Sequence, residues 1–342
     1  MPVNKVVFGD RTLIDLTSDT VSADKLAKGV TAHDKTGEQI TGTMESGGSS
    51  EKYGATLDTF LGDVNVSGVL QAPTAQTDLV FDGVTDLANS ALQYKFYENP
   101  TIKTVSFPNL VQISGALALQ QCFYNAQQIE AINFPVLKSI SGNSCFGYAF
   151  QNNKSILSIE FPSLISISGV STFYGAFKGN NLTSCSFPVL EKITELGTFN
   201  GSFQNCYALT SAQFPKLKQI GDDNTTSRSS RHFSNTFSSC SKLTTLEFPE
   251  LTSIYCSDRG DTEGTFYGNN TIQKMYFPKL TVIDKSPAYT GYSTSQNYIF
   301  SGCNSLTELH FGAANQAAIE AKEGYPTLWG RGAGKATVYF DL

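Results

Sequence analysis

The sequence predicts a repeat solenoid, because one short motif returns at nearly regular intervals along the chain. The motif is Phe-Pro-x-Leu, and its seven copies begin at Phe107, Phe134, Phe161, Phe187, Phe214, Phe248 and Phe277. Successive copies are 27, 27, 26, 27, 34 and 29 residues apart. Such a period is typical of stacked structural units, each too small to bury its apolar face alone. We expect the stack to present a long surface.

Two further positions recur in every repeat. An Ile stands six residues after each anchor Phe, from Ile113 to Ile283. A second Phe stands ten or eleven residues before each following anchor, and the series ends with Phe237, Phe266 and Phe300. The length differences between repeats fall mainly between the Ile and this second Phe. Insertions are therefore expected in one segment of each coil.

The residue pattern within each repeat predicts three local elements. Alternation of apolar and polar residues, as in Leu243–Phe248, predicts a strand that ends at the Pro, and a short second strand follows through Leu251–Ile254. Phenylalanines four residues apart, such as Phe146 and Phe150, predict a single turn of α- or 3₁₀-helix that points both rings inward. Three residues after the second Phe comes a small or polar residue, predicted to stack from coil to coil: Asn153, Asn180, Cys206, Cys240, Asn269 and Cys303.

This pattern resembles the leucine-rich repeats of the BspA-like bacterial type, in which an aromatic-rich turn precedes x-x-Leu-x-x-Ile-x-Phe-Pro. The resemblance covers residues 81–311. It implies a leucine-rich-repeat-like parallel β-sheet stack of about eight coils with short helical turns. Phe stands where Leu dominates in other leucine-rich repeats, which affects the curvature of the stack more than its class.

Composition excludes several classes of function. The net charge is −6 and no basic run stands out, so nucleic acid is not an expected partner. No apolar stretch is long enough to span a membrane, and residues 1–10 lack the apolar run of a signal peptide. The seven cysteines follow repeat positions. We interpret them as free, buried thiols, and a bridge between Cys206 and Cys240 is the alternative.

Both ends depart from the repeat. In residues 1–44, Ser22 is predicted to cap a helix over 23–28, and Asp34–Gly37 reads as a hairpin turn. Together with residues 13–20, this module resembles one in tail-associated proteins of bacteriophages that infect Gram-positive bacteria. The resemblance implies a virion anchor, and a small β-rich module without that role is the alternative. A Gly/Ser linker follows at 45–50, and a spacer or N-terminal cap at 51–80.

The C-terminal residues 312–342 are expected to cap the last coil, since a bare terminal coil exposes a strand edge. The segment comprises a predicted helix over 313–322 and a strand over 336–340. Trp329, the single tryptophan, is interpreted as an anchor of this cap.

No catalytic, metal or cofactor site is predicted. The three histidines, His33, His232 and His310, fall in different modules, and no Gly-rich phosphate loop occurs. Acidic residues gather in two variable segments, which leaves polysaccharide cleavage and calcium binding as alternatives to turn formation. These residues are Asp222, Asp223, Asp258, Asp261 and Glu263. The tripeptide Arg259-Gly260-Asp261 also occurs in integrin ligands, but three residues recur by chance.

The variable segments predict a binding surface. Loops 221–236, 255–265 and 284–299 occupy the same place in near-consecutive coils and are expected to project from one side. Tyr and Arg are enriched in recognition patches. The alternative is that long surface loops are tolerated, because closure entropy grows slowly with length. The candidate binding residues are Arg228, Arg231, His232, Tyr255, Arg259, Tyr289, Tyr292 and Tyr298.

These observations favour a non-enzymatic bacteriophage tail adhesin. Residues 1–44 would bind other tail proteins, and the repeat surface would bind a host-cell glycan or protein, with several copies, in a possible homotrimer, adding avidity. Assembly would take place in the host cytoplasm and the mature protein would lie in the virion tail. The alternative is a bacterial cell-surface or secreted leucine-rich repeat adhesin. A tail scaffold or polysaccharide depolymerase is a third hypothesis.

Overall fold

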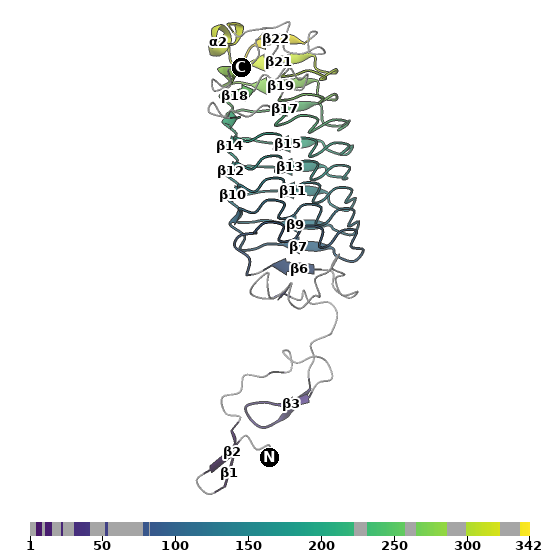
Figure 1. Cartoon of the computed structure of the whole chain (residues 1–342), viewed down its shortest axis with the longest axis vertical. Helices are drawn as coiled ribbons and strands as arrows, with labels where there is room; N and C mark the ends of the chain where they lie inside the picture. Colours follow the sequence, from purple (N-terminus) through teal and green to yellow (C-terminus); the bar gives the residue numbers. More distant parts are fainter. Residues whose placement is uncertain are drawn as a thin grey trace. The chain divides into compact units, whose positions relative to one another are not determined.

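The computed structural model divides the chain into two units, Met1–Glu51 and Lys52–Leu342. It describes residues 5–8, 11–15, 22, 31–41, 52–53, 78–81, 83–221, 231–256, 265–285, 299–321 and 336–342. In the first unit, β1 (Lys5–Phe8) pairs antiparallel with β2 (Arg11–Asp15), and β3 (Thr31–His33) with β4 (Gln39–Thr41). The second unit is a parallel β-solenoid of about eight coils (Figure 1).

The predicted hairpin turn joins β3 to β4. The carboxylate of Asp34 accepts hydrogen bonds from the backbone N–H groups of Thr36 and Glu38 at 2.8 and 3.1 Å. Gly37 has a φ of 80°, which favours glycine. The helix predicted over 23–28 and the linker predicted at 45–50 lie outside the described residues.

The strand that precedes each Phe-Pro, called here the anchor strand, forms one wall of the solenoid. Together with β5, β6, β21 and β22, which no Phe-Pro follows, these strands form three parallel sheets, ordered β5-β6-β7-β9, β11-β13-β15 and β17-β19-β21-β22. Their bounds are β5 (Lys52–Tyr53), β6 (Asp78–Phe81), β7 (Thr104–Ser106), β9 (Ala131–Asn133), β11 (Ser158–Glu160), β13 (Ser184–Ser186), β15 (Ser211–Gln213), β17 (Thr245–Glu247), β19 (Lys274–Phe277), β21 (Glu308–Phe311) and β22 (Thr337–Phe340). The ladder is thus interrupted between β9 and β11 and between β15 and β17.

The predicted second strands form another wall without interruption. They make one seven-stranded parallel sheet, and the repeated isoleucines lie in register, as Ile140 does with Ile167. The strands are β8 (Gln112–Ile113), β10 (Ser139–Ile140), β12 (Ser166–Ile167), β14 (Lys192–Ile193), β16 (Gln219–Ile220), β18 (Ser253–Cys256) and β20 (Val282–Lys285). In the seven repeats with a Phe-Pro, the Pro after the anchor strand ends one ladder and turns the chain into the next, as the sequence predicts.

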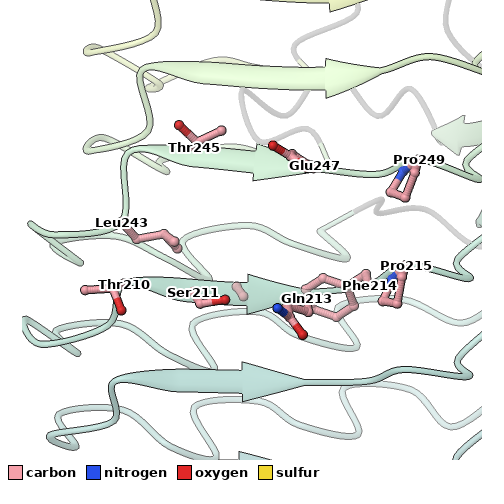
Figure 2. A pocket seen from close by; sticks show the side chains of 10 residues that line it. Thr210, Ser211, Gln213, Phe214, Pro215, Leu243, Thr245, Glu247 and Pro249 are labelled. Atoms are coloured by element: carbon pink, nitrogen blue, oxygen red, sulfur yellow. The ribbon is translucent and has the colours of Figure 1, made fainter.

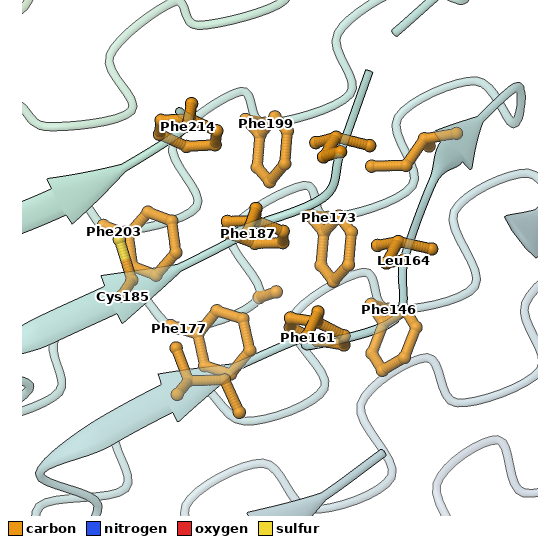
Figure 3. Packing of buried hydrophobic residues seen from close by; sticks show 14 of the residues in the cluster. Phe146, Phe161, Leu164, Phe173, Phe177, Cys185, Phe187, Phe199, Phe203 and Phe214 are labelled. Atoms are coloured by element: carbon orange, nitrogen blue, oxygen red, sulfur yellow. The ribbon is translucent and has the colours of Figure 1, made fainter. Parts of the chain in front are cut away.

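Stacked phenylalanines fill the core (Figure 3). The anchor rings stack on those of the next coil, with centroids 5.1 Å apart for Phe161 and Phe187 and 5.2 Å for Phe187 and Phe214. A second column of rings packs edge-on against them, as Phe199 does against Phe187 at 5.1 Å and 78°. Aromatic pairs prefer both arrangements. The predicted pile of side chains, coil upon coil, is therefore confirmed.

The predicted helical turn is a different structure. The segment forms a ribbon of successive turns in which every fourth residue has a positive φ, as at Ser171, Gly175 and Gly179 with 51°, 60° and 75°. The N–H of Gly175 donates to Asn200 O in the next coil at 3.0 Å, and that of Ala176 donates to Phe173 O at 3.0 Å. Left-handed residues cannot continue a helix. The prediction of α- or 3₁₀-helix here is therefore wrong.

This turn ribbon comprises residues 89–98, 116–125, 143–152, 170–179, 196–205, 232–239, 265–268 and 299–302. The last two stretches are one four-residue turn shorter than the stretch at 232–239. Phe266 consequently stacks on Phe233 at 5.6 Å, and Phe300 stacks on Phe266 at 5.7 Å. The sequence alignment, which matched both residues to Phe237, is wrong by one turn.

Beside the shorter ribbon at 265–268, asparagine side chains accept the hydrogen bonds that the carbonyls of a second turn would accept. Asn269 Oδ1 accepts a hydrogen bond from Phe237 N at 2.8 Å, and Asn270 Oδ1 accepts one from Ser239 N at 3.0 Å. In the longer ribbons such N–H groups donate to backbone carbonyls of the next coil. The amide oxygens thereby satisfy donors that would otherwise lack an acceptor.

The predicted column of small and polar residues is present and buried. All its members except Asn180 donate hydrogen bonds to the carbonyl of a Phe one coil back, such as Asn153 Nδ2 to Phe123 O at 3.0 Å and Cys206 Sγ to Phe177 O at 3.2 Å. Cys206 and Cys240 are free thiols, as interpreted from the sequence. Burial raises the pKa of Cys206 to about 12, so the thiol stays protonated.

The C-terminal segment adds a strand to the anchor-strand wall beside β21. The predicted helix is shorter than expected and consists of η2 (Ala313–Asn315) and α2 (Gln316–Glu320), with Ile319 buried. The predicted strand is β22, which pairs in parallel with β21 and aligns Phe340 with Phe311. Trp329 lies outside the described residues. Within the described ranges, no helix has the length and apolar character needed to cross a bilayer.

Candidate recognition surfaces

The three predicted loops are attached to neighbouring elements. They follow β16, β18 and β20, which are adjacent strands of the seven-stranded sheet, and they lead into consecutive turn ribbons. Phe233 N donates to Thr265 O, and Phe266 N to Ile299 O, so the return points also stack. The attachment points therefore share one side of the coils. The loop bodies, 222–230, 257–264 and 286–298, lie outside the described residues.

Most of the predicted binding residues belong to those loop bodies, and the position of one described residue requires a correction. Arg231 and Tyr255 are half-buried at the loop ends. His232 is only 2% exposed and points inward at the place that Thr198 and Thr265 occupy in adjacent coils. Burial lowers its pKa to about 4. The prediction of His232 as a surface binding residue is therefore wrong. The remaining candidates outside the described residues are Arg228, Arg259, Tyr289, Tyr292 and Tyr298.

The outer side of the turn ribbons carries tyrosines that the sequence analysis missed. Tyr174 is 39% exposed, and Tyr207, directly after its ribbon, is 59% exposed. Tyr97 and Tyr124 stack from coil to coil with centroids 4.8 Å apart. Tyr97, Tyr124 and Tyr174 each directly follow an inward phenylalanine, and this recurring Phe-Tyr pair was the available signal. Half-buried and exposed tyrosine rings that carry hydroxyl groups suit recognition of a partner.

The wall of anchor strands is hollowed where its ladder is interrupted. A hollow of about 460 Å³ lies between β15 and β17, and Gln213, Thr245 and Glu247 line it (Figure 2). A smaller one of about 240 Å³ lies between β9 and β11 and includes Glu160. The strands on either side of each hollow are not paired with each other, and the lining is partly polar. The two hollows are therefore a second candidate recognition surface.

The C-terminal end of the same wall carries a closed polar network. His310 stacks between Tyr276 and Tyr339, with centroids 4.5 and 4.7 Å away. Its Nδ1 lies 2.9 Å from Asp341 Oδ1, and its Nε2 lies 3.1 Å from Glu308 Oε2. Every ring nitrogen has a partner, which indicates a structural brace between coils. Among the described residues, no group of three or more His, Cys, Asp or Glu could hold a metal ion.

Comparison with known proteins identifies the repeat. The BspA type leucine rich repeat region matches residues 89–224, 175–288 and 232–321, with six copies. Among solved structures, a leucine-rich repeat protein from Bacteroides ovatus is 19% identical, with 80% of this chain and 69% of that chain covered and a TM-score of 0.32. None of the curated proteins is significantly similar to the chain.

Two further solved structures are similar at low identity. A leucine-rich repeat protein from Eubacterium ventriosum is 14% identical over 80% of this chain and 78% of that chain, with a TM-score of 0.34. A leucine rich cell surface protein from Faecalibacterium prausnitzii is 12% identical over 80% and 87%, with a TM-score of 0.18. The family match spans most of the chain and agrees with the stacked coils described above. The chain belongs to the BspA-type leucine-rich repeat family.

Proposed function

We propose that the chain is a non-enzymatic binding protein of a bacterial cell surface, which recognises a glycan or protein partner through the outer side of its turn ribbons. The observation that carries this proposal is the exposure of tyrosine side chains on this side, with Tyr174 and Tyr207 the most exposed among those named. Tyrosine rings offer a large contact area with a polar end, which suits binding of either kind of partner. Family membership favours a bacterial surface protein over a virion component.

The experiment measures binding of the fluorescently labelled full-length protein to whole bacterial cells. Tyr174→Ser and Tyr207→Ser together are expected to lower binding at least about tenfold, the effect of losing two aromatic contacts. Leu157→Ser is the control, because Leu157 is 58% exposed but lies outside the turn ribbons. Equal loss in both variants, or saturable binding to neither cells nor isolated wall material, would contradict the proposal.

A tail-associated role is the second candidate. It draws on the separation of Met1–Glu51 from the repeat unit. In this setting residues 1–44 join other tail proteins and the repeat unit binds the host receptor. Deleting residues 1–50 is expected to abolish incorporation into tails while leaving the melting temperature of the repeat unit unchanged. Incorporation of the truncated chain at the normal level would exclude the anchoring role. Release of oligosaccharides from wall polysaccharide would instead reveal a depolymerase.

A further inference from the structure

A small trough lies on the outer side of the turn ribbons, within the surface assigned above to binding. Its volume is about 120 Å³, and its walls include Tyr148, Tyr174, Lys178, Asn200, Gln204 and Asn235. These residues come from four consecutive coils, so the trough depends on the stacking itself.

The trough exists because side chains are missing at one position of the ribbon. In successive coils this position holds Tyr148, Gly175, Gly201 and Asn235, all with a φ between 52° and 64°. A Cβ at Gly175 would lie 2.5 Å from Tyr148 Cε1, so the tyrosine ring covers that glycine. A Cβ at Gly201 would meet only Gln204 Oε1, at 4.0 Å. The ring of Tyr148 therefore fills the space above Gly175, whereas the space above Gly201 is open.

The first wall of the trough is aromatic. Tyr148 and Tyr174 pack edge to face, with centroids 5.0 Å apart and ring planes at 80°. Burial and the neighbouring side chain of Tyr174 raise the pKa of Tyr148. The pair is thus a fixed, uncharged platform with one ring lying over a neighbouring glycine.

The other walls offer unused polar groups. Within the described residues, the side chains of Lys178, Asn200 and Gln204 make no hydrogen bond. The two amides supply both donors and acceptors, and the lysine supplies a positive charge. No carboxylate lines the trough. A ligand here meets an aromatic surface, amides that can pair with hydroxyl groups, and one cation.

We propose that this trough binds one residue of an acidic saccharide. The C–H face of a sugar ring packs on the tyrosine platform, because the negative face of an aromatic ring attracts polarised C–H groups. The sugar hydroxyl groups pair with the amides of Asn200 and Gln204, and the carboxylate approaches Lys178. A hydroxyl-rich ligand uses donors and acceptors in equal measure, as these amides do. This inference rests on the proposed function and names its ligand class.

The test fills the trough while keeping the backbone. Gly201→Asn places a side chain in the open space, and Asn235 already adopts the same left-handed conformation one coil later. The matched control is Gly197→Asn, on the same ribbon with a φ of 61°, against 64° at Gly201, and outside the trough. Tyr148→Asn removes the platform, and Lys178→Gln removes the charge. Circular dichroism and melting temperature establish that each full-length variant is folded.

Tetragalacturonate and cellotetraose serve as acidic and neutral probes in titration calorimetry. Tetragalacturonate is expected to bind the native protein and the Gly197→Asn variant alike. Gly201→Asn and Tyr148→Asn are expected to bind it at least about tenfold more weakly, and Lys178→Gln to reduce its preference over cellotetraose. Failure of tetragalacturonate to bind, or equal affinity for the Gly201→Asn and Gly197→Asn variants, would overturn the inference.

The same variants separate this inference from the proposed function. If Gly201→Asn binds bacterial cells as well as the native protein does, the saccharide site is wrong while the binding role stands. If the native protein binds tetragalacturonate in the trough but binds no cells, the trough is a saccharide site and the cell-surface role is wrong.

Discussion

The coils before residue 240 and those after it stack in the same way, but their turn ribbons differ in length. The ribbon at 170–179 contains two complete turns, whereas the ribbon at 265–268 contains one. Yet the anchor rings stack on both sides of the change, with Phe214 and Phe248 at 5.9 Å and Phe248 and Phe277 at 5.6 Å. The column of anchor phenylalanines therefore defines the stack, while the length of the ribbon varies around it.

The largest effect is expected from removing an anchor ring. Phe187 is stacked at 5.1 and 5.2 Å on its neighbours and has an edge contact at 5.1 Å with Phe199. The corresponding contacts of Phe277 are longer, at 5.6, 5.7 and 5.9 Å. Phe187→Ala should cost about 3–5 kcal/mol, as core Phe-to-Ala changes do, and Phe277→Ala less. Urea unfolding measures both, and a larger loss at Phe277 would reverse the comparison.

The next effect concerns the place where the ribbon shortens. Asn269 Nδ2 donates to Phe233 O and Phe266 O at 2.9 and 2.8 Å, and Asn269 Oδ1 accepts from Phe237 N. Asn269→Ala leaves buried groups unpaired, at about 1–3 kcal/mol for each. Asn270→Ala is the control, because Asn270 is exposed and water can replace its single bond. Similar urea midpoints for the two variants would mean that the buried amide is not what holds the short ribbon.

His232, which begins the last two-turn ribbon, predicts a dependence on pH. Its folded-state pKa, lowered to about 4 by burial, lies below its ordinary value of 6.5. Between pH 6.5 and about 4, His232 is therefore protonated in the unfolded chain but neutral in the folded chain. Stability should fall as pH drops through this window, by at most about 1.4 kcal/mol per pH unit from this residue. His232→Thr, which introduces the residue found at this place in the adjacent coils, should lower the pH 7-to-5 difference in urea unfolding; an unchanged difference contradicts the prediction.

The smallest effect is expected from ion pairs on the surface. Lys218 Nζ lies 3.0 Å from Glu191 Oε1 in the first set of coils, and Lys279 Nζ lies 2.8 Å from Glu250 Oε1 in the second. Lys279 also approaches Glu250 Oε2, at 2.9 Å, and lowers the pKa of that carboxyl group. Lys218→Met and Lys279→Met should shift the urea midpoint less than Asn269→Ala, and added salt should remove the shift. A salt-independent loss would show that packing of the lysine stem matters instead.

The sequence predicted the parts of the fold that side-chain periodicity controls. The spacing of Phe107, Phe134 and their successors predicted the stack, and Ile140 and Ile167 lie in register as expected. The four-residue spacing of Phe146 and Phe150 was compatible with a helix, because a helical turn and two successive β-turns bring residues at nearly the same interval to one side. Only backbone angles separate the two, and non-glycine residues such as Tyr148 gave no sign of a positive φ.

The candidate surface was less accessible from the sequence. Alignment by spacing assigned Phe266 to the wrong column, because the loss of four residues places it eleven residues before Phe277, the spacing of a second Phe in the longer coils. His232 was chosen for its residue type within a variable segment, but burial is decided by the coil before and the coil after. The trough above Gly201 combines residues from four coils, and its cause is an absent side chain. No local motif records that arrangement.

The amides that stand in for a missing turn give this architecture a way to vary its outline. A coil can lose one four-residue turn from its ribbon if Asn side chains accept the hydrogen bonds of the backbone N–H groups in the preceding coil. Asn269 and Asn270 do this here. The column of anchor phenylalanines continues past the change, so the outer contour of such a protein is free to diverge in discrete steps. Related chains should therefore differ in ribbon length by multiples of four, with amide-bearing residues at the edge of each gap.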